Sequence, residues 1–210
     1  RGDCMTLLAF VTLEGRGGPV DPHALTTSLR ERWGLNVASP MHGEEPGILV
    51  FDLMGCLATV SHVPGPLPWS DLSGPATAAW HWKDATEVLQ AHQSHLLVGL
   101  LREDDKPPIN RAILLTLLTA SVIQCVPGCT GVYWPSGTAV TSAETFAESV
   151  EQMTPAELPL ACWIEFRVFG GSTPNTSCVF TTGMTALGHL EIEVRDSRME
   201  PTELVDRVYD

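Results

Sequence analysis

The sequence predicts an α+β fold in which antiparallel sheets are covered by helices. Three observations favour it: 44% of the 210 residues are hydrophobic and only 18% are charged, the predicted strands occur in adjacent pairs, and helices are interleaved between these pairs. Two ferredoxin-like halves are one arrangement that this order allows, although no sequence repeat relates the halves. We expect a single α+β domain over residues 1–210, with 1–75 and 76–210 as possible subdomains.

The first part of the chain predicts a β-α-β-β unit. Asp21-Pro22 supplies an N-cap and a first-turn proline, and Gly34 follows the last apolar position of the helix. Met54-Gly55 separates two apolar runs, as the turn of a hairpin does. The predicted elements are a strand at 5–13, a helix from 22 to 33, and hairpin strands at 47–53 and 56–63.

The second part predicts alternating helices and strands. Ser142, two residues before Glu144, is a helix N-cap. The apolar run 112–126 spans 15 residues, whereas a membrane helix needs about 20, so we interpret it as a buried helix. The predicted elements are helices at 77–93, 110–125 and 142–153, a helix from 201 onward, and strands at 95–101, 130–134, 138–141, 161–169, 178–182 and 188–194.

The acidic composition restricts the classes of partner. The net charge is −13, and no two basic residues are adjacent in the sequence. Binding to nucleic acid or to an anionic membrane needs clusters of Lys and Arg, so neither is expected. A basic protein partner would instead be attracted.

Six cysteines are too few for a disulfide scaffold in a chain of this length, and most of them lie in apolar runs. This pattern favours buried thiols in a reducing compartment, so we predict a cytoplasmic protein. Cys125 and Cys129 are spaced so that they could form half of a metal site or a disulfide, but the sequence offers no second close pair.

The segment 64–101 concentrates three tryptophans and three histidines. It lacks a nucleophile with its base, a closed set of metal ligands and a phosphate-binding loop, so we predict no catalytic residue, no metal and no cofactor. Glu191 and Glu193 lie on one face of the predicted strand 188–194, which we interpret as its solvent face. The alternative is a metal- or ligand-binding enzyme whose pocket is lined by Trp69, His81, Trp82, His92 and His95.

Six short motifs, taken in their order and spacing, resemble the bacterial domain-of-unknown-function family 4261. They are Pro66-Leu67-Pro68-Trp69, Ala79–Trp82, His92–Leu96, Val132-Tyr133-Trp134, Cys162–Phe166, and Thr182-Gly183-Met184 before Leu190-Glu191-Ile192. The resemblance covers nearly the whole chain. It implies similarity to proteins encoded beside secreted bacterial toxins, hence an immunity or accessory role, and it carries over no catalytic residues.

These observations lead to the hypothesis of a non-enzymatic immunity protein that binds and neutralises a cognate basic toxin, such as a nuclease effector of type VI secretion. An effector chaperone or adaptor is a further alternative, and the oligomeric state is left open. Acidic loops would steer the basic partner and gain association rate. The candidate partner-binding residues are Glu44, Glu45, Glu103, Asp104 and Asp105.

Overall fold

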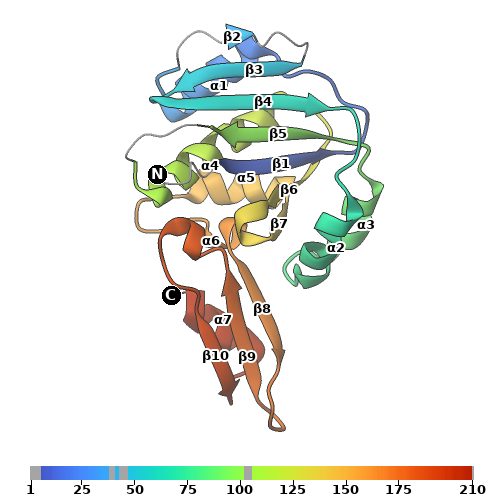
Figure 1. The fold of residues 1–210 in the computed structure, drawn as a ribbon, viewed down its shortest axis with the longest axis vertical. Coiled ribbons are helices and arrows are strands. Elements are labelled where there is room, and N and C mark those ends of the chain that lie inside the picture. The colour runs from blue at the N-terminus through green and yellow to red at the C-terminus, as the bar shows by residue number, and fades with distance from the viewer. Residues whose placement is uncertain (1–5, 38–40, 43–46, 102–105, 210) are drawn as a thin grey trace.

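The structure is a computed structural model that describes residues 6–37, 41–42, 47–101 and 106–209 (Figure 1). Within these residues the strands form two antiparallel sheets and helices pack beside them, so the predicted α+β fold is confirmed. The larger sheet and the helices that pack on it form the part of the molecule that we call the body. The smaller sheet and the C-terminal helix extend from one end of this body.

The larger sheet has seven strands among the described residues, in the order β2-β3-β4-β5-β1-β6-β7. They are β1 (Leu7–Leu13), β2 (Met41–His42), β3 (Ile48–Leu53), β4 (Cys56–Val63), β5 (Ser94–Leu100), β6 (Cys129–Trp134) and β7 (Ala139–Ser142). β1 pairs with β5 on one side and with β6 on the other. Strands from 1–75 and 76–210 are therefore interleaved in one continuous sheet, which does not divide into two ferredoxin-like halves.

The hairpin of β3 and β4 confirms a prediction from the sequence. Met54 and Gly55 have φ angles of 54° and 86°, and Leu53 pairs with Cys56 across the turn. Positive φ at both central residues is what a tight two-residue hairpin of the favoured twist requires. The glycine lowers the cost of this turn, and the pairing then extends to Ile48 and Ser61.

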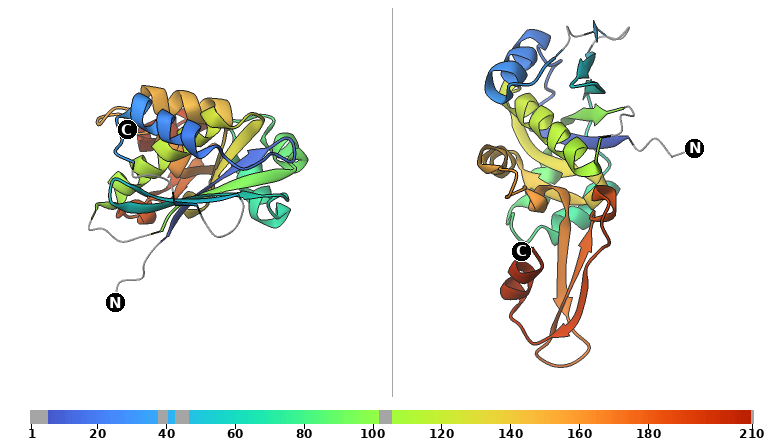
Figure 2. Two further views of the ribbon diagram at one scale, coloured as in Figure 1. Left: turned by 90° about the horizontal axis from the view of Figure 1, so that it is seen from above. Right: turned by 90° about the vertical axis from the view of Figure 1, so that its left-hand side faces the viewer.

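One face of the large sheet is covered by α1 (Pro22–Trp33), α4 (Pro108–Cys125) and α5 (Ala143–Gln152) (Figure 2). The predicted caps are confirmed. The Asp21 carboxylate accepts from the His23 N–H at 2.9 Å, Ser142 Oγ accepts from the Thr145 N–H at 3.1 Å, and Gly34 ends α1 with a φ of 65°. Each cap satisfies backbone groups that a helix end leaves open.

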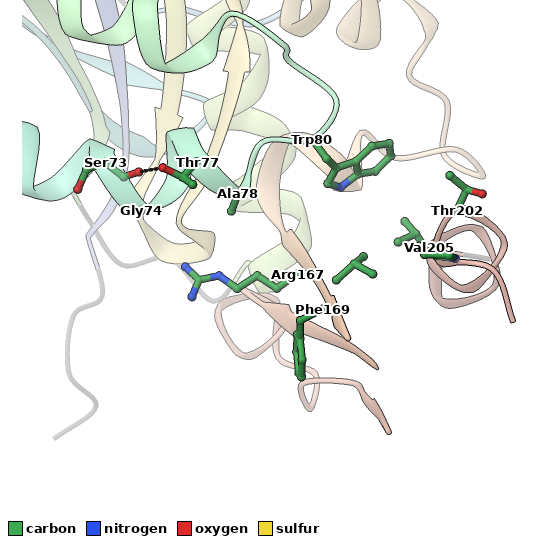
Figure 3. A pocket seen from close by; sticks show the side chains of 11 residues that line it. Ser73, Gly74, Thr77, Ala78, Trp80, Arg167, Phe169, Thr202 and Val205 are labelled. Carbon is green, nitrogen blue, oxygen red and sulfur yellow. Dashed lines mark hydrogen bonds between the residues drawn. The ribbon is translucent and has the colours of Figure 1, made fainter. Parts of the chain in front are cut away.

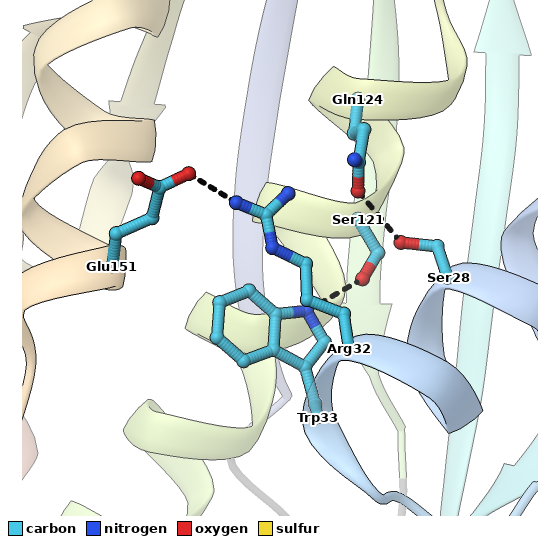
Figure 4. Close-up of polar contacts among 6 residues, drawn as sticks. All are labelled: Ser28, Arg32, Trp33, Ser121, Gln124 and Glu151. Carbon is cyan, nitrogen blue, oxygen red and sulfur yellow. Dashed lines mark hydrogen bonds and ion pairs between the residues drawn. The ribbon is translucent and has the colours of Figure 1, made fainter.

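Polar contacts join these three helices on their outer side (Figure 4). Trp33 Nε1–H donates to Ser121 Oγ at 3.0 Å, and the Arg32 guanidinium lies 5.0 Å from the Trp33 ring centroid. Arg32 also pairs with Glu151, so α1 contacts both α4 and α5. The ion pair is partly exposed and adds little stability, whereas the tryptophan fixes the spacing of α1 and α4.

Among the described residues, α4 alone is long and apolar enough by length and composition to cross a membrane. Half of it is buried inside the protein, where it contacts β1, β5, α1 and α5. The hydroxyls of Thr116 and Thr119 donate to carbonyls one turn earlier at 2.7 and 2.8 Å. Packing within the protein thus accounts for its apolar composition, as the sequence predicted for a buried helix.

The opposite face of the sheet carries a second, smaller core. Here α2 (Trp69–Ala78) and α3 (Ala85–Ala91) replace the single helix predicted over 77–93, which was wrong. The chain leaves the helical conformation at Ala79, where ψ is 68°. Trp82 then packs so closely on Gly131 of β6 that an added Cβ there would lie 2.8 Å from its ring. This contact turns Trp82 into the core and leaves Trp80 outside.

The C-terminal arm consists of α6 (Leu160–Trp163), β8 (Glu165–Gly170), β9 (Ser177–Thr182), β10 (Glu193–Ser197) and α7 (Pro201–Tyr209), with strand order β10-β9-β8. Two strand predictions were wrong here. Residues 161–163 of the predicted strand 161–169 are helical. The predicted strand 188–194 begins only at Glu193, since Gly188 with a φ of 86° ends a 3-10 turn and Leu190 is 89% exposed.

Trp163 forms the joint between the arm and the body. Its side chain is 1% exposed, lies 6.2 Å from the Trp134 ring centroid in a stacked arrangement, and donates from Nε1 to Thr116 Oγ1 at 2.8 Å. Gly137 and Gly183 pack directly on its backbone. The arm is therefore attached through buried aromatic packing and close backbone contact.

Glu191 is a structural carboxylate and does not simply face solvent as predicted. Partial burial raises its pKa, but hydrogen bonds from the Thr185 and Gly183 N–H groups and from the Thr181 and Thr185 hydroxyls outweigh this effect and lower the pKa. The carboxylate thereby caps the turn 183–185 and joins it to β9.

We expect Glu191→Gln to reduce the free energy of unfolding at pH 7 by about 1 kcal/mol, because charge-assisted hydrogen bonds are lost. The pKa of Glu191 is lower in the folded state than in the unfolded chain, so its stabilisation is present above the unfolded value of about 4.3 and disappears as pH falls through the folded value. Urea unfolding at several pH values measures this. The control is Glu193→Gln, which removes an exposed carboxylate paired with Arg195. Equal losses in both variants, or a difference that grows at acid pH, would contradict the assignment.

Candidate functional site

A groove lies between the body and the arm (Figure 3). Its cavity has a volume of about 770 Å³ and is lined by α2, by Trp80 just beyond the C-cap of α2, by β8 and by the first half of α7. The surface is largely apolar: Ala78, Val168 and Val205 contribute to the walls, and Arg167 is the one charged residue among the lining side chains. A cavity of this size and character is suited to binding part of another molecule.

Two aromatic side chains are exposed at this groove. Trp80 is 60% exposed and Phe169 is 52% exposed, whereas Trp134 and Trp163 are almost fully buried. Exposing large apolar side chains to water is unfavourable unless a partner covers them, and tryptophan is enriched among residues that dominate binding interfaces. We therefore regard the groove as the candidate binding site.

A smaller pocket of about 180 Å³ adjoins the groove and shares Ala78 and Trp80 with it. Its wall includes Glu165, which is 6% exposed. Glu165 Oε2 accepts from Thr138 Oγ1 at 2.8 Å and from Arg167 Nε at 2.9 Å, whereas Oε1 has no hydrogen-bond partner among the described residues. The bonded oxygen ties β8 to the turn after β6 and holds Arg167 beside the groove.

His81 also lines the smaller pocket. Desolvation lowers its pKa, although part of the ring is exposed, and the hydrogen bond to the Val140 carbonyl at 3.1 Å acts in the opposite direction. At neutral pH the imidazole is therefore uncharged and donates from Nε2. The centroids of the His81 and Trp80 rings lie 5.6 Å apart in an edge-to-face contact, so His81 helps to position the segment that carries Trp80.

His92 and His95 hold the proline-rich loop before α2 in place. Nδ1–H of His92 donates to the Leu89 carbonyl, and its Nε2 accepts from the Leu67 N–H at 2.7 Å. His95 donates from Nδ1 to the Gly65 carbonyl at 2.8 Å, and burial lowers its pKa. These bonds give both rings structural roles.

The residues proposed for a His/Trp pocket are thus divided among different environments. Trp69 and Trp82 pack against the second core, His81 bonds to β7, and His92 and His95 fix the loop. Within the described residues no group of three or more His, Cys, Asp or Glu side chains is arranged to hold a metal. Trp80, which lies within the Ala79–Trp82 motif but was not among the predicted pocket residues, is the tryptophan that reaches the groove.

Burial keeps at least two of the cysteines from acting as reactive thiols. Cys125 and Cys129 are free thiols, and burial raises the pKa of Cys129 to about 12. Cys129 Sγ donates to the Val126 carbonyl at 3.2 Å. Burial likewise raises the pKa of Cys162 to about 11. Cys129 and Cys162 therefore remain protonated and unreactive at neutral pH.

The predicted partner-binding residues Glu44, Glu45, Glu103, Asp104 and Asp105 lie outside the described residues. The groove itself was missed in the sequence because its walls come from three separate segments: α2 with Trp80, β8, and α7. The available signals were an aromatic at 80 that is followed by Lys83 and Asp84 one helical turn later, and a second aromatic at 169 in a predicted strand.

Comparison with known proteins adds no family assignment. No family model, curated protein or solved structure matches the chain.

Proposed function

We propose that the chain is a non-enzymatic immunity protein that binds a basic bacterial toxin and neutralises it. The observation that carries the binding role is the apolar groove between α2 and the arm, with Trp80 exposed at its wall. The net charge of −13 favours a basic partner, and the resemblance to proteins encoded beside secreted toxins supports neutralisation as the outcome of binding.

The partner's affinity should depend on Trp80. We expect Trp80→Ala to weaken binding at least about 30-fold, because truncating a central aromatic anchor costs 2 kcal/mol or more. Leu190→Ala is the matched control: Leu190 is 89% exposed and does not line the groove. Affinity and association rate can be measured by surface plasmon resonance. The association rate should fall as salt is raised, because charge attraction is screened.

The full test captures the partner from the native host with tagged protein and then expresses that partner alone or together with this chain. Toxicity that is suppressed by the wild-type chain and returns with Trp80→Ala supports the proposal. A partner that is bound but remains toxic indicates an effector chaperone or adaptor. Neutralisation unaffected by Trp80→Ala removes the groove from the proposal.

A further inference from the structure

We infer that the free edge of β8 binds an extended basic segment of the partner as a fourth strand of the small sheet. The inference rests on the proposed function in that it specifies how a polypeptide partner occupies the groove. It goes further than the proposed function because it states that the partner's backbone is bound as well as its side chains.

The pairing of β8 with β9 determines which backbone groups are free. Gly171 N–H donates to the Thr176 carbonyl at 2.8 Å, and residues pair in register from there back to Glu165 and Thr182. In an antiparallel ladder, alternate residues direct both backbone groups to the same neighbour. Residues 165, 167 and 169 therefore bond to β9, and Phe166, Val168 and Gly170 direct their N–H and C=O groups away from it.

These outward groups have no hydrogen-bond partner in the described part of the chain. Arg167, Val168 and Phe169 line the groove in succession, so side chains from both faces of β8 contribute and the groove follows the strand edge. α7 lies on one side of this edge, and α2 with Trp80 lies on the other (Figure 3). A strand placed here would be hydrogen-bonded to β8 and enclosed from both sides.

The two edges of the small sheet differ in a way that favours this role. β10, at the opposite edge, has an irregular register between Val194 and Ser197, and Asp196 adopts a φ of 51°. Charged side chains occupy positions 193, 195 and 196. Bulges and charges are the usual devices that block unwanted strand pairing. β8 pairs regularly over its whole length and carries Phe166, Val168 and Phe169.

Charge complementarity identifies the occupant as a basic segment. The chain carries a net charge of −13, Glu200 and Glu203 are exposed and adjoin in sequence the α7 residues that line the groove, and Arg167 is already paired with Glu165. The Trp80 ring offers a surface on which a Lys or Arg side chain can stack. The segment that fits has apolar side chains facing α7, beside Val205, and alternate basic side chains facing Trp80.

The probe is an acetylated and amidated heptapeptide of alternating valine and lysine, titrated into the full chain by isothermal titration calorimetry. Its control is the same peptide with alternate backbone nitrogens methylated on the side that faces β8, which removes donors without changing charge or side chains. We expect methylation to weaken binding at least tenfold. We also expect slower amide hydrogen exchange at Phe166, Val168 and Gly170 when the unmodified peptide is bound.

On the protein side, Val168→Pro removes one outward N–H and no bond to β9, a substitution that edge strands tolerate. Val168→Ala is the control because it shortens the side chain and keeps the N–H. Val168→Pro should weaken peptide binding at least tenfold, and Val168→Ala less than threefold. Should Val168→Pro not fold, as circular dichroism would reveal, the methylated peptide with the wild-type chain decides the question.

Three outcomes overturn the inference: equal binding of the methylated and unmethylated peptides, no binding of the basic peptide, or a stable dimer in light scattering in which these three amides are already protected. The experiment also separates this inference from the proposed function. If the Val168→Pro variant still neutralises the toxin and the Trp80→Ala variant does not, the proposed function stands and strand addition is rejected. If the peptide binds as expected but no toxin is neutralised, strand addition stands and the proposed function is rejected.

Discussion

Replacing Trp163 by alanine is expected to lower the free energy of unfolding by about 3–5 kcal/mol. The side chain is 1% exposed, stacks against Trp134, and donates to Thr116 Oγ1 at 2.8 Å. Its removal leaves a cavity bounded by α4 and by the end of β6, and the surrounding backbone has little room to collapse because Gly137 and Gly183 already contact residue 163. Urea unfolding followed by far-UV circular dichroism measures the loss.

The control is the same substitution at Trp80. This side chain is 60% exposed, so Trp80→Ala should change the free energy of unfolding by less than about 0.5 kcal/mol while reducing partner binding. The pair separates a tryptophan used for folding from one available for binding. Similar stability losses in the two variants would show that Trp80 is part of the core and would withdraw it from the binding site.

Local signals in the sequence predicted much of the fold. Asp21, Gly34 and Ser142 act as caps where expected, because capping depends on side-chain and backbone chemistry within a few residues. Met54-Gly55 likewise forms the expected turn. These features do not require knowledge of distant parts of the chain.

The failed predictions depended on distant contacts. The break between α2 and α3 follows from the packing of Trp82 on Gly131, and these residues are 49 positions apart in the sequence. Glu191 caps a turn after β9 because the chain folds back across it, and the alternation of Leu190, Ile192 and Val194 gave no sign of this. Periodicity describes a single element, whereas these features arise between elements.

The groove could not be predicted for the same reason. Ser73 and Thr202 line one cavity although more than half the chain separates them. Composition led us to expect a basic partner, but it could not assign the contact surface. The acidic loops favoured in the sequence lie outside the described residues, and the groove depends instead on apolar and backbone groups. Under the proposed function, charged rim residues would mainly affect the association rate and the groove contacts would mainly affect dissociation.

Gly137→Ala is expected to cost about 3 kcal/mol or more, at the upper end of overpacking effects. A Cβ at this position would lie 1.8 Å from the Trp163 carbonyl oxygen and 3.2 Å from that of Thr182. Both obstacles are backbone atoms, so rotation of a side chain cannot relieve the clash. Gly18→Ala is the matched control, because no atom lies within 4 Å of its added Cβ. It should change stability by less than about 1 kcal/mol.

The position of the clash also determines which part of the molecule should loosen. Gly137 belongs to the turn between β6 and β7, whereas residue 163 leads directly into β8, so relief of the clash requires the arm to move away from the body. Hydrogen exchange in Gly137→Ala should therefore accelerate in β8 and β9 more than in β1 and β5. Uniform acceleration would show that arm and body unfold as one unit. Unchanged stability would mean that the two backbones are not in contact and that the joint described at Trp163 is incorrect.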